Sequence, residues 1–405
     1  MTRRAASGTG HGPRRSLLLL ATASLGFLGT FGNPPATRIN DPLVPDTILT
    51  IPSGPTLILE RAAGIPAMGI RVSMPLDPVW PAAARMLVEQ ALDRAGNRAA
   101  AIGAEVWGGI RDGRIVFHAI GAARDSDELA WVIRLLTAEP GTVGTAAAIS
   151  RERARLEQLA ETPRGRLLLE MESRVTGTGP GSALPAARAA DVHAMWQRSH
   201  ARDRIRIFVL GDLSLPWVLA DLSRIGAPPR SAPGAPYLPE PVRLSFPESP
   251  LYSWSAAAFT LGPAHDPAVL AAAAALRAGL RGIDVANAAV TVLEGPPDGS
   301  GWIGVTARAT RSREADAALN SALELLTEEG FDAWWAQGAA IARSDFLAAA
   351  ATPGGWMALS DRYFSADGTT SARTALNQLS ALRRQDFAPV VERFRSTLFH
   401  PRIDG

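Results

Sequence analysis

One short stretch decides how this chain folds, and it reads Ala84-Arg85-Met86-Leu87-Val88-Glu89-Gln90-Ala91-Leu92. It lies in a run from Pro81 to about Arg98 that is rich in alanine and leucine, and proline is favoured in the first turn of a helix. The run therefore predicts an early helix over 81–98. On that helix Met86 and Gln90 are four residues apart, so they share one face, with Glu89 beside them.

Periodic patterns of apolar residues continue on both sides of that helix. Alternating apolar residues predict strands, and apolar residues at helical spacing predict helices. A glycine-rich turn is expected at Gly108-Gly109, between two of the strands. In chain order we expect strands at 56–60 and 68–74, a helix at 81–98, strands at 105–107 and 114–120, helices at 126–137, 145–159 and 190–200, and a strand at 205–210. A similar order returns after a proline-rich stretch, which suggests an internal duplication.

Four segments of the first half carry a family resemblance. Around 84–92 the pattern is similar to the inverted zinc motif H-x-x-E-H. Residues 102–112 resemble a segment that usually reads G-G-x-x-N-A-x-T-x-x-D, and 151–159 resemble an E-R-x-x-V-x-x-E-I helix. Residues 191–212 resemble a helix–strand unit that ends in V-V-G-D. In this order the segments resemble the pitrilysin, insulinase and mitochondrial processing peptidase family of inverzincin metallopeptidases.

The resemblance implies an α+β fold of two homologous domains. In the family each domain is an antiparallel sheet with helices packed on one face, and the two close like a clamshell around a peptide. We expect an N-terminal peptidase-like domain over 45–225, a proline-rich linker over 226–244 and a C-terminal peptidase-like domain over 245–405. The second half resembles the family in layout only.

The zinc site that the resemblance implies has lost its ligands. Met86 and Gln90 stand in place of its two histidines, and Gln158 stands in place of its third ligand, a glutamate. A thioether and two carboxamides are poor ligands for Zn²⁺, so we expect neither a metal nor any other cofactor. Glu89 stands in place of the general base. It is either a relic that hydrogen-bonds within the cleft or an exposed helix residue, since without a zinc-bound water it cannot perform the family's hydrolysis.

The candidates for a peptide cleft are four other residues. Val106 and Trp107 replace the usual Asn-Ala of the family segment, and Arg111 keeps its place near the segment's end. In the family the second domain adds an arginine and a tyrosine that contact the substrate carbonyl. Here Arg281 alone matches them and no tyrosine follows, which is a second sign of lost catalysis.

Two further residue groups have simpler interpretations. His193 and His200 are seven residues apart, roughly 10 Å along one helix, which is too far for them to share one zinc. We expect them to pack or to form hydrogen bonds. The tryptophans Trp334, Trp335 and Trp356 either pack within the core or between the domains, or anchor a partner protein.

Composition excludes several classes of function. The chain has no cysteine, so disulfides, thiolate metal sites and a cysteine nucleophile are excluded. The formal net charge is +2, but Arg3, Arg4, Arg14 and Arg15 precede the first apolar run. Without these four, 37 of the 41 basic residues remain against 39 acidic ones, which is −2. The basic isoelectric point therefore gives no reason to expect a nucleic-acid partner.

The first 32 residues have the pattern of an export signal. Arg14-Arg15 is followed by leucines and an apolar run to about Gly32, the order of a secretory leader. This predicts an exported protein, in the periplasm or another extracytoplasmic space. The run is short for a membrane span of ~20 residues. An uncleaved membrane anchor formed by residues 16–32 is the alternative.

The sequence predicts a non-catalytic homologue of insulinase-type zinc metallopeptidases. We expect it to form a hetero-oligomer with an active member of the family and to hold a peptide or support its partner. One alternative is a purely structural scaffold subunit. The other is an active zinc metallopeptidase whose ligands lie at positions other than Met86, Gln90 and Gln158.

Overall fold

The computed structural model describes most of the chain after residue 46. The described ranges are 47–61, 66–76, 81–111, 113–176, 184–185, 189–212, 215–226, 241–242, 252–262, 265–281, 288–294, 302–364 and 371–400. All belong to one compact unit, Leu43–Gly405. The predicted leader at 1–32 lies outside them, and so does the linker at 226–244 apart from Gly226 and Pro241–Val242. The leader and the domain boundaries therefore stay predictions.

The first half is built on a six-stranded sheet. Its strands are β1 (Thr47–Thr50), β2 (Thr56–Glu60), β3 (Ala67–Pro75), β4 (Glu105–Arg111), β5 (Arg114–Ala122) and β7 (Arg206–Leu210). Their order is β1-β2-β7-β3-β5-β4, so β4 is an edge strand among the described residues. All pairs are antiparallel except β2–β7. That parallel pair requires a long connection between its two strands, and the segment from β3 to the helices before β7 supplies it.

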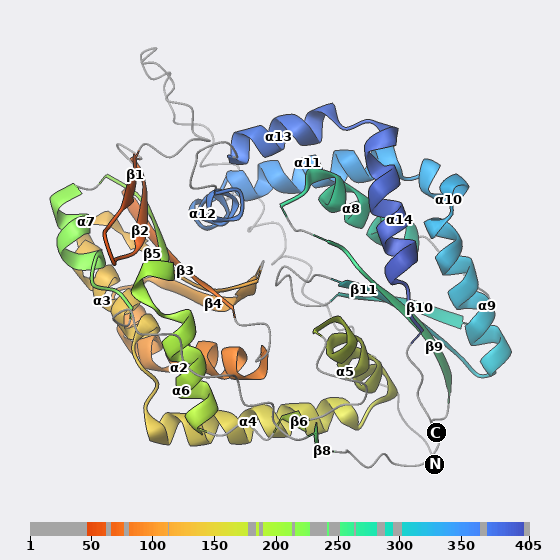
Figure 1. Cartoon of the computed structure of the whole chain (residues 1–405), viewed down its shortest axis with the longest axis horizontal. Helices are drawn as coiled ribbons and strands as arrows, with labels where there is room; N and C mark the ends of the chain where they lie inside the picture. The colour runs from red at the N-terminus through yellow and green to blue at the C-terminus, as the bar shows by residue number, and fades with distance from the viewer. Residues whose placement is uncertain are drawn as a thin grey trace, which may run out of the picture. The chain divides into compact units, whose positions relative to one another are not determined.

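The two faces of this sheet differ because side chains alternate along each strand. On β3, Met68, Ile70, Val72 and Met74 belong to the main core of the first half. Helices cover that face, including α2 (Pro81–Ala101) and α3 (Ser126–Thr137), as Figure 1 shows. The intervening β3 residues, among them Arg71, therefore lie on the opposite face, which we call the second face.

Three further helices complete the first half. They are α4 (Thr142–Ala160), α6 (Ala189–Ser199) and α7 (Leu215–Leu222). Both α4 and α6 pack against α2, and α7 packs against α3. The helix predicted over 81–98 is thus confirmed as α2, and the helices expected at 126–137, 145–159 and 190–200 are α3, α4 and α6.

The second half repeats this plan with a three-stranded antiparallel sheet, in the order β10-β11-β9. Its strands are β9 (Ser253–Thr260), β10 (Ala288–Glu294) and β11 (Trp302–Ala309). Its helices are α8 (Pro267–Arg281), α9 (Ser312–Leu323), α10 (Glu328–Asp332), α11 (Trp335–Ala350), α12 (Pro353–Arg362), α13 (Ala372–Ala381) and α14 (Ala388–Thr397). The strand–helix–strand–strand–helix order of β3 to α3 returns in β9 to α9. This supports the internal duplication.

Each half contributes one helix that packs on the sheet of the other half. Helix α5 (Pro163–Thr176) packs on β9 and β11, while α12 packs on β3 and β7. Both helices follow a Thr-Pro-x-Gly sequence that begins at Thr162 and at Thr352. The Thr162 hydroxyl accepts a hydrogen bond from Gly165 N at 3.0 Å, and the Thr352 hydroxyl accepts one from Gly355 N at 3.1 Å. The shared cap is a second sign of duplication.

The glycine-rich turn predicted at Gly108-Gly109 is wrong. Both glycines lie within β4, which continues to Arg111. A Cβ at Gly108 would lie 2.8 Å from the Phe117 ring, and one at Gly109 would lie 2.7 Å from the Trp107 ring. The glycines are there because neighbouring aromatic rings cover the strand. The chain turns later, next to Gly113, whose φ of 68° favours glycine.

Candidate functional site: the α2–α4 seam and the second face

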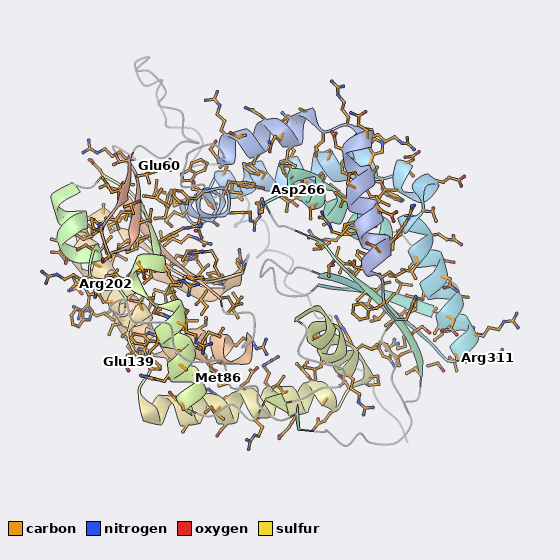
Figure 2. The ribbon with its side chains drawn as sticks, viewed as in Figure 1. Glu60, Met86, Glu139, Arg202, Asp266 and Arg311 are labelled. Atoms are coloured by element: carbon orange, nitrogen blue, oxygen red, sulfur yellow. The ribbon has the colours of Figure 1, made fainter. Side chains whose placement is uncertain are left out.

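The positions that the family resemblance assigns to zinc ligands, Met86, Gln90 and Gln158, lie on α2 and α4. Met86 is 1% exposed and belongs to the core of the first half; it is labelled in Figure 2. Gln90, one turn further on, is 4% exposed. Its Oε1 accepts a hydrogen bond from the Thr145 hydroxyl at 3.3 Å, and its Nε2 has no hydrogen-bond partner among the described residues. Gln158 is exposed on α4. The structure thus buries two of the three positions and leaves the third in solvent.

A set of ion pairs joins the two helices beside these positions. Arg85, Glu89 and Asp93 follow one another at four-residue spacing along α2, so they form one row. We call this row, together with Arg151, Glu152 and Arg155 of α4, the charged seam. Arg85 Nε lies 2.9 Å from Glu152 Oε1. Arg151 pairs with Glu89 and lies 3.0 Å from Asp93 Oδ2.

Glu152 is the best buried member of the charged seam, at 7% exposure. Arg155 donates to both of its oxygens, at 2.7 and 2.8 Å. Burial by itself raises the pKa of the Glu152 carboxyl, but the hydrogen bonds and positive charges of Arg155 and Arg85 outweigh burial and lower this pKa. Glu152 is therefore a carboxylate whose charge is matched by two guanidinium groups.

These residues do not fit a zinc ion. Met86 offers a buried thioether, Gln90 offers a carboxamide that already accepts a hydrogen bond from Thr145, and the buried carboxylate of Glu152 is occupied by arginines. Guanidinium groups also repel a second cation. Within the described part of the chain, no group of three or more His, Asp or Glu side chains is placed to hold a metal.

The equivalent helix pair of the second half is closed by small residues instead. Helices α2 and α8 begin at Pro81 and Pro267. In α2 the fourth and eighth residues after the proline are Arg85 and Glu89. In α8 the same two positions are Ala271 and Ala275. Gly338 of α11 packs so closely that a Cβ there would lie 2.5 Å from both the Ala271 carbonyl and the Ala275 Cβ. The first half thus keeps polar groups at a seam that the second half packs with alanine and glycine.

The peptide-cleft candidates of β4 divide between the two faces of the sheet. Trp107 lies on the second face, where its ring centroid is 5.5 Å from that of His118. The Arg111 guanidinium lies 4.4 Å from the Trp107 ring centroid, a cation–π contact. Val106 packs into the core on the other face. Arg281 is the last residue of α8, and its side chain lies outside the described residues.

His118 is held neutral at this position. Burial, together with the charges of Arg71 and Arg111, lowers the pKa of its imidazole to about 4. Both ring nitrogens are buried without a hydrogen-bond partner among the described residues. Its ring faces the start of α12, because a Cβ at Gly354 would lie 3.8 Å from His118 Cε1.

A buried ion pair fastens α12 to the second face. Arg71 Nε lies 3.0 Å from Asp361 Oδ2, and both side chains are about 95% buried. At the other end of α12, the Trp356 indole donates a hydrogen bond to Glu60, which is labelled in Figure 2. Trp356 is 6% exposed, so the packing interpretation of this tryptophan is confirmed.

The predicted histidine roles agree with their surroundings. His200 is fully buried, and burial lowers the pKa of its imidazole to about 3. Its Nδ1 lies 2.8 Å from the Ser199 hydroxyl. His193 Nδ1 lies 3.1 Å from the Glu139 carboxylate. The two histidines thus have separate partners.

Sequence reasoning missed the charged seam and the Arg71–Asp361 pair. One signal was available, because Arg85, Glu89 and Asp93 recur at helical spacing and α4 carries arginine at 151, 153 and 155. Nothing in the sequence connects Arg71 with Asp361, which is 290 residues away.

Several solved structures that match this fold are peptidases of the M16 class. The periplasmic protease PqqL from Escherichia coli matches with a TM-score of 0.59 and 12% identity, over 87% of this chain and 44% of that chain. A protease from Helicobacter pylori matches with a TM-score of 0.60 and 11% identity, over 88% and 99%. The peptidase M16 inactive domain from Pseudomonas fluorescens matches with a TM-score of 0.59 and 14% identity, over 87% and 95%.

At these identities the shared property is the fold. It confirms the α+β class with sheets and packed helices, and the insulinase-like architecture that the sequence resembled. This chain spans less than half of PqqL and nearly the whole length of the other two. No protein-family model matches the sequence, and no curated protein matches it. Across the described residues, no helix combines the length and the apolar character needed to cross a membrane.

Proposed function

We propose that this chain is a non-catalytic, exported homologue of M16 metallopeptidases that holds a peptide or supports an active partner of the same class. The observation that carries this proposal is the charged seam. Arg85, Arg151 and Arg155 lie beside the positions that the family resemblance assigns to zinc ligands, and each pairs with a carboxylate there. A seam built in this way stabilises two helices and supplies no Lewis acid.

The edge strand β4 supports peptide binding. An edge strand presents unpaired backbone groups to which an extended peptide can add as a further strand. The aromatic and basic side chains of Trp107 and Arg111 flank this edge on the second face. Peptide holding thus needs neither zinc nor Glu89.

Two of the structural neighbours support the remaining parts of the proposal. The Pseudomonas fluorescens structure is described as an inactive domain of peptidase M16, which is a precedent for this fold without activity. PqqL is described as periplasmic, in line with the export signal read from residues 1–32.

The two alternatives have less support. A purely structural scaffold would need an apolar docking surface. The large hydrophobic residues that are exposed in the described part of the chain are Ile48, Trp131, Tyr252 and Leu347, which lie on four separate segments. An active metallopeptidase with other ligands would need a cluster of metal-binding side chains, and the described residues form none.

The proposal is tested by purifying the chain from its native host. We expect it to co-purify with a protein that has an intact H-x-x-E-H motif, and we expect the pair to cleave peptides that this chain alone does not. Glu89→Gln should leave the pair's activity nearly unchanged, because Glu89 binds Arg151 and has no metal-bound water to deprotonate. A loss of roughly 10³-fold with folding and pairing intact would mean that Glu89 is catalytic. Recovery of the chain as a lone active peptidase would also contradict the proposal.

A further inference from the structure

The second face of β4 presents an indole ring beside the edge of the first sheet. Side chains alternate along a strand, so Glu105, Trp107, Gly109 and Arg111 share this face. Trp107 and Gly109 are both partly exposed, and their strand is the edge of the sheet among the described residues. A peptide strand that added to β4 would therefore lie next to this ring.

The Trp107 ring reaches over Gly109. A Cβ at Gly109 would lie 2.7 Å from both Cζ2 and Cη2 of the indole. This is closer than van der Waals contact, so the ring can take its place only because glycine has no side chain. The indole thus fills the position on the second face that a side chain at residue 109 would otherwise occupy.

Two neighbours hold the ring in this place. The Arg111 guanidinium carbon lies 4.4 Å from the ring centroid, a cation–π contact. His118 of β5 lies directly opposite Trp107 in register, and the two ring centroids are 5.5 Å apart. His118 is neutral near pH 7, because burial and nearby arginines lower its pKa to about 4. The indole is therefore in position before a ligand arrives, which lowers the entropic cost of binding.

We infer that the peptide strand that adds to β4 carries a bulky apolar side chain, best an aromatic one, opposite Gly109 on the second face. The inference rests on the proposed peptide-holding function and names the side-chain class of its ligand. Directly opposite residues of neighbouring strands have Cβ atoms about 4.5–5.5 Å apart. The peptide residue opposite Gly109 therefore meets the Trp107 indole. An aromatic ring there can contact the indole edge to face, which stabilises aromatic pairs beyond their apolar contact.

The backbone and the indole contribute to binding in different ways. Main-chain hydrogen bonds along β4 bind any extended peptide, so they supply affinity without a preference for sequence. The contact with Trp107 depends on one side chain of the peptide, so it supplies the preference. Loss of the indole should therefore remove the preference and leave the holding of a peptide by the β4 backbone.

The test compares three short fluorescent peptides that alternate threonine and serine and differ only in a central phenylalanine, leucine or threonine. Binding to the full chain is measured by fluorescence anisotropy. We expect the phenylalanine peptide to bind roughly tenfold tighter than the threonine peptide, with the leucine peptide between them, because the central side chain buries apolar surface against the indole.

Two substitutions in β4 locate this preference. Trp107→Ala removes the indole, and Gly109→Ala adds a Cβ that displaces it. Both variants should bind the three peptides nearly alike, with the affinity that the threonine peptide has for the unchanged protein. Trp131→Ala, which removes an exposed tryptophan of α3, and Gly96→Ala, whose Cβ meets nothing within 4 Å, are the matched controls and should keep the full preference. Circular dichroism checks each fold, and Gly109→Ala decides alone if Trp107→Ala does not fold.

The outcomes separate this inference from the function on which it rests. Equal binding of the phenylalanine and threonine peptides to the unchanged protein would overturn the apolar preference and leave peptide holding intact. A preference that survives both β4 substitutions would lie away from Trp107 and would also overturn the inference. Failure of all three peptides to bind would overturn the inference and the proposed peptide holding together.

Discussion

At the scale of single residues, Glu152 is the side chain on which the charged seam depends. It is buried, it accepts hydrogen bonds from Arg85 and Arg155, and it lies on the helix where the family resemblance places a metal ligand. Two guanidinium groups hold it at the α2–α4 seam. Their removal would leave a buried carboxylate without compensation, which is unfavourable in any protein interior.

Glu152→Gln should therefore lower the free energy of unfolding by about 2–3 kcal/mol at pH 7. Urea denaturation followed by circular dichroism measures this change. Glu157→Gln, an exposed carboxylate of the same helix, is the control and should stay within about 0.5 kcal/mol of the unchanged protein. An equal effect of the two substitutions would show that the Glu152 interactions do not stabilise the seam.

The destabilisation caused by Glu152→Gln should also depend on pH. Since the pKa of Glu152 is lowered in the fold, its contribution to stability is present above its unfolded pKa of about 4.3 and is lost as pH falls through the folded value. The stability difference between the unchanged protein and Glu152→Gln should accordingly shrink below about pH 4. A difference that grows as pH falls would contradict the lowered pKa.

At the scale of elements, the sequence predicts most helices and strands because their periodicity is local. Helix α2, the antiparallel β3 and β5, and β7 fall within a few residues of their expected ranges. The length of β4 was not predicted, because Gly108 is required by Phe117 across the strand and by Val88 of α2, neither of which is adjacent in sequence. Partners in the charged seam were not predicted for the same reason, since Arg85 and Glu152 are 67 residues apart.

The close packing of the chain at the start of α12 gives a prediction about stability. A Cβ at Gly355 would lie 2.2 Å from the Ala349 carbonyl oxygen, so Gly355→Ala should destabilise the protein by about 1–3 kcal/mol. Gly96 of α2 is the control, because a Cβ there meets nothing within 4 Å. Gly96→Ala should instead stabilise by up to about 1 kcal/mol, as alanine is the better helix former. Thermal unfolding of the two variants should therefore shift in opposite directions, and a shared direction would contradict the close approach at Gly355.

At the scale of the whole molecule, the two halves are held together by the helices that they exchange. The Arg71–Asp361 ion pair links α12 to the first sheet in a nearly solvent-free position. Such a pair is costly to break, because the remaining partner is left buried and charged. It therefore fixes α12 on the second face of the first sheet.

Asp361→Asn should lower the free energy of unfolding by about 3 kcal/mol, since Arg71 then keeps its charge without a carboxylate. The double variant Arg71→Met with Asp361→Leu should recover most of this loss, because well-packed apolar residues can replace a buried ion pair. Urea denaturation of the single and double variants measures these changes in the free energy of unfolding. A single substitution that costs nothing would mean that α12 does not depend on this pair.

The central claim is that the charged seam takes the place of a metal centre, and the metal content of the purified chain tests it most directly. The protein is incubated with excess zinc, dialysed, and its zinc measured by elemental analysis. Because Met86, Gln90 and Gln158 supply no strong ligand and the arginines of the seam repel a cation, we predict far less than one zinc per chain. About one tightly held zinc per chain after dialysis would contradict the account.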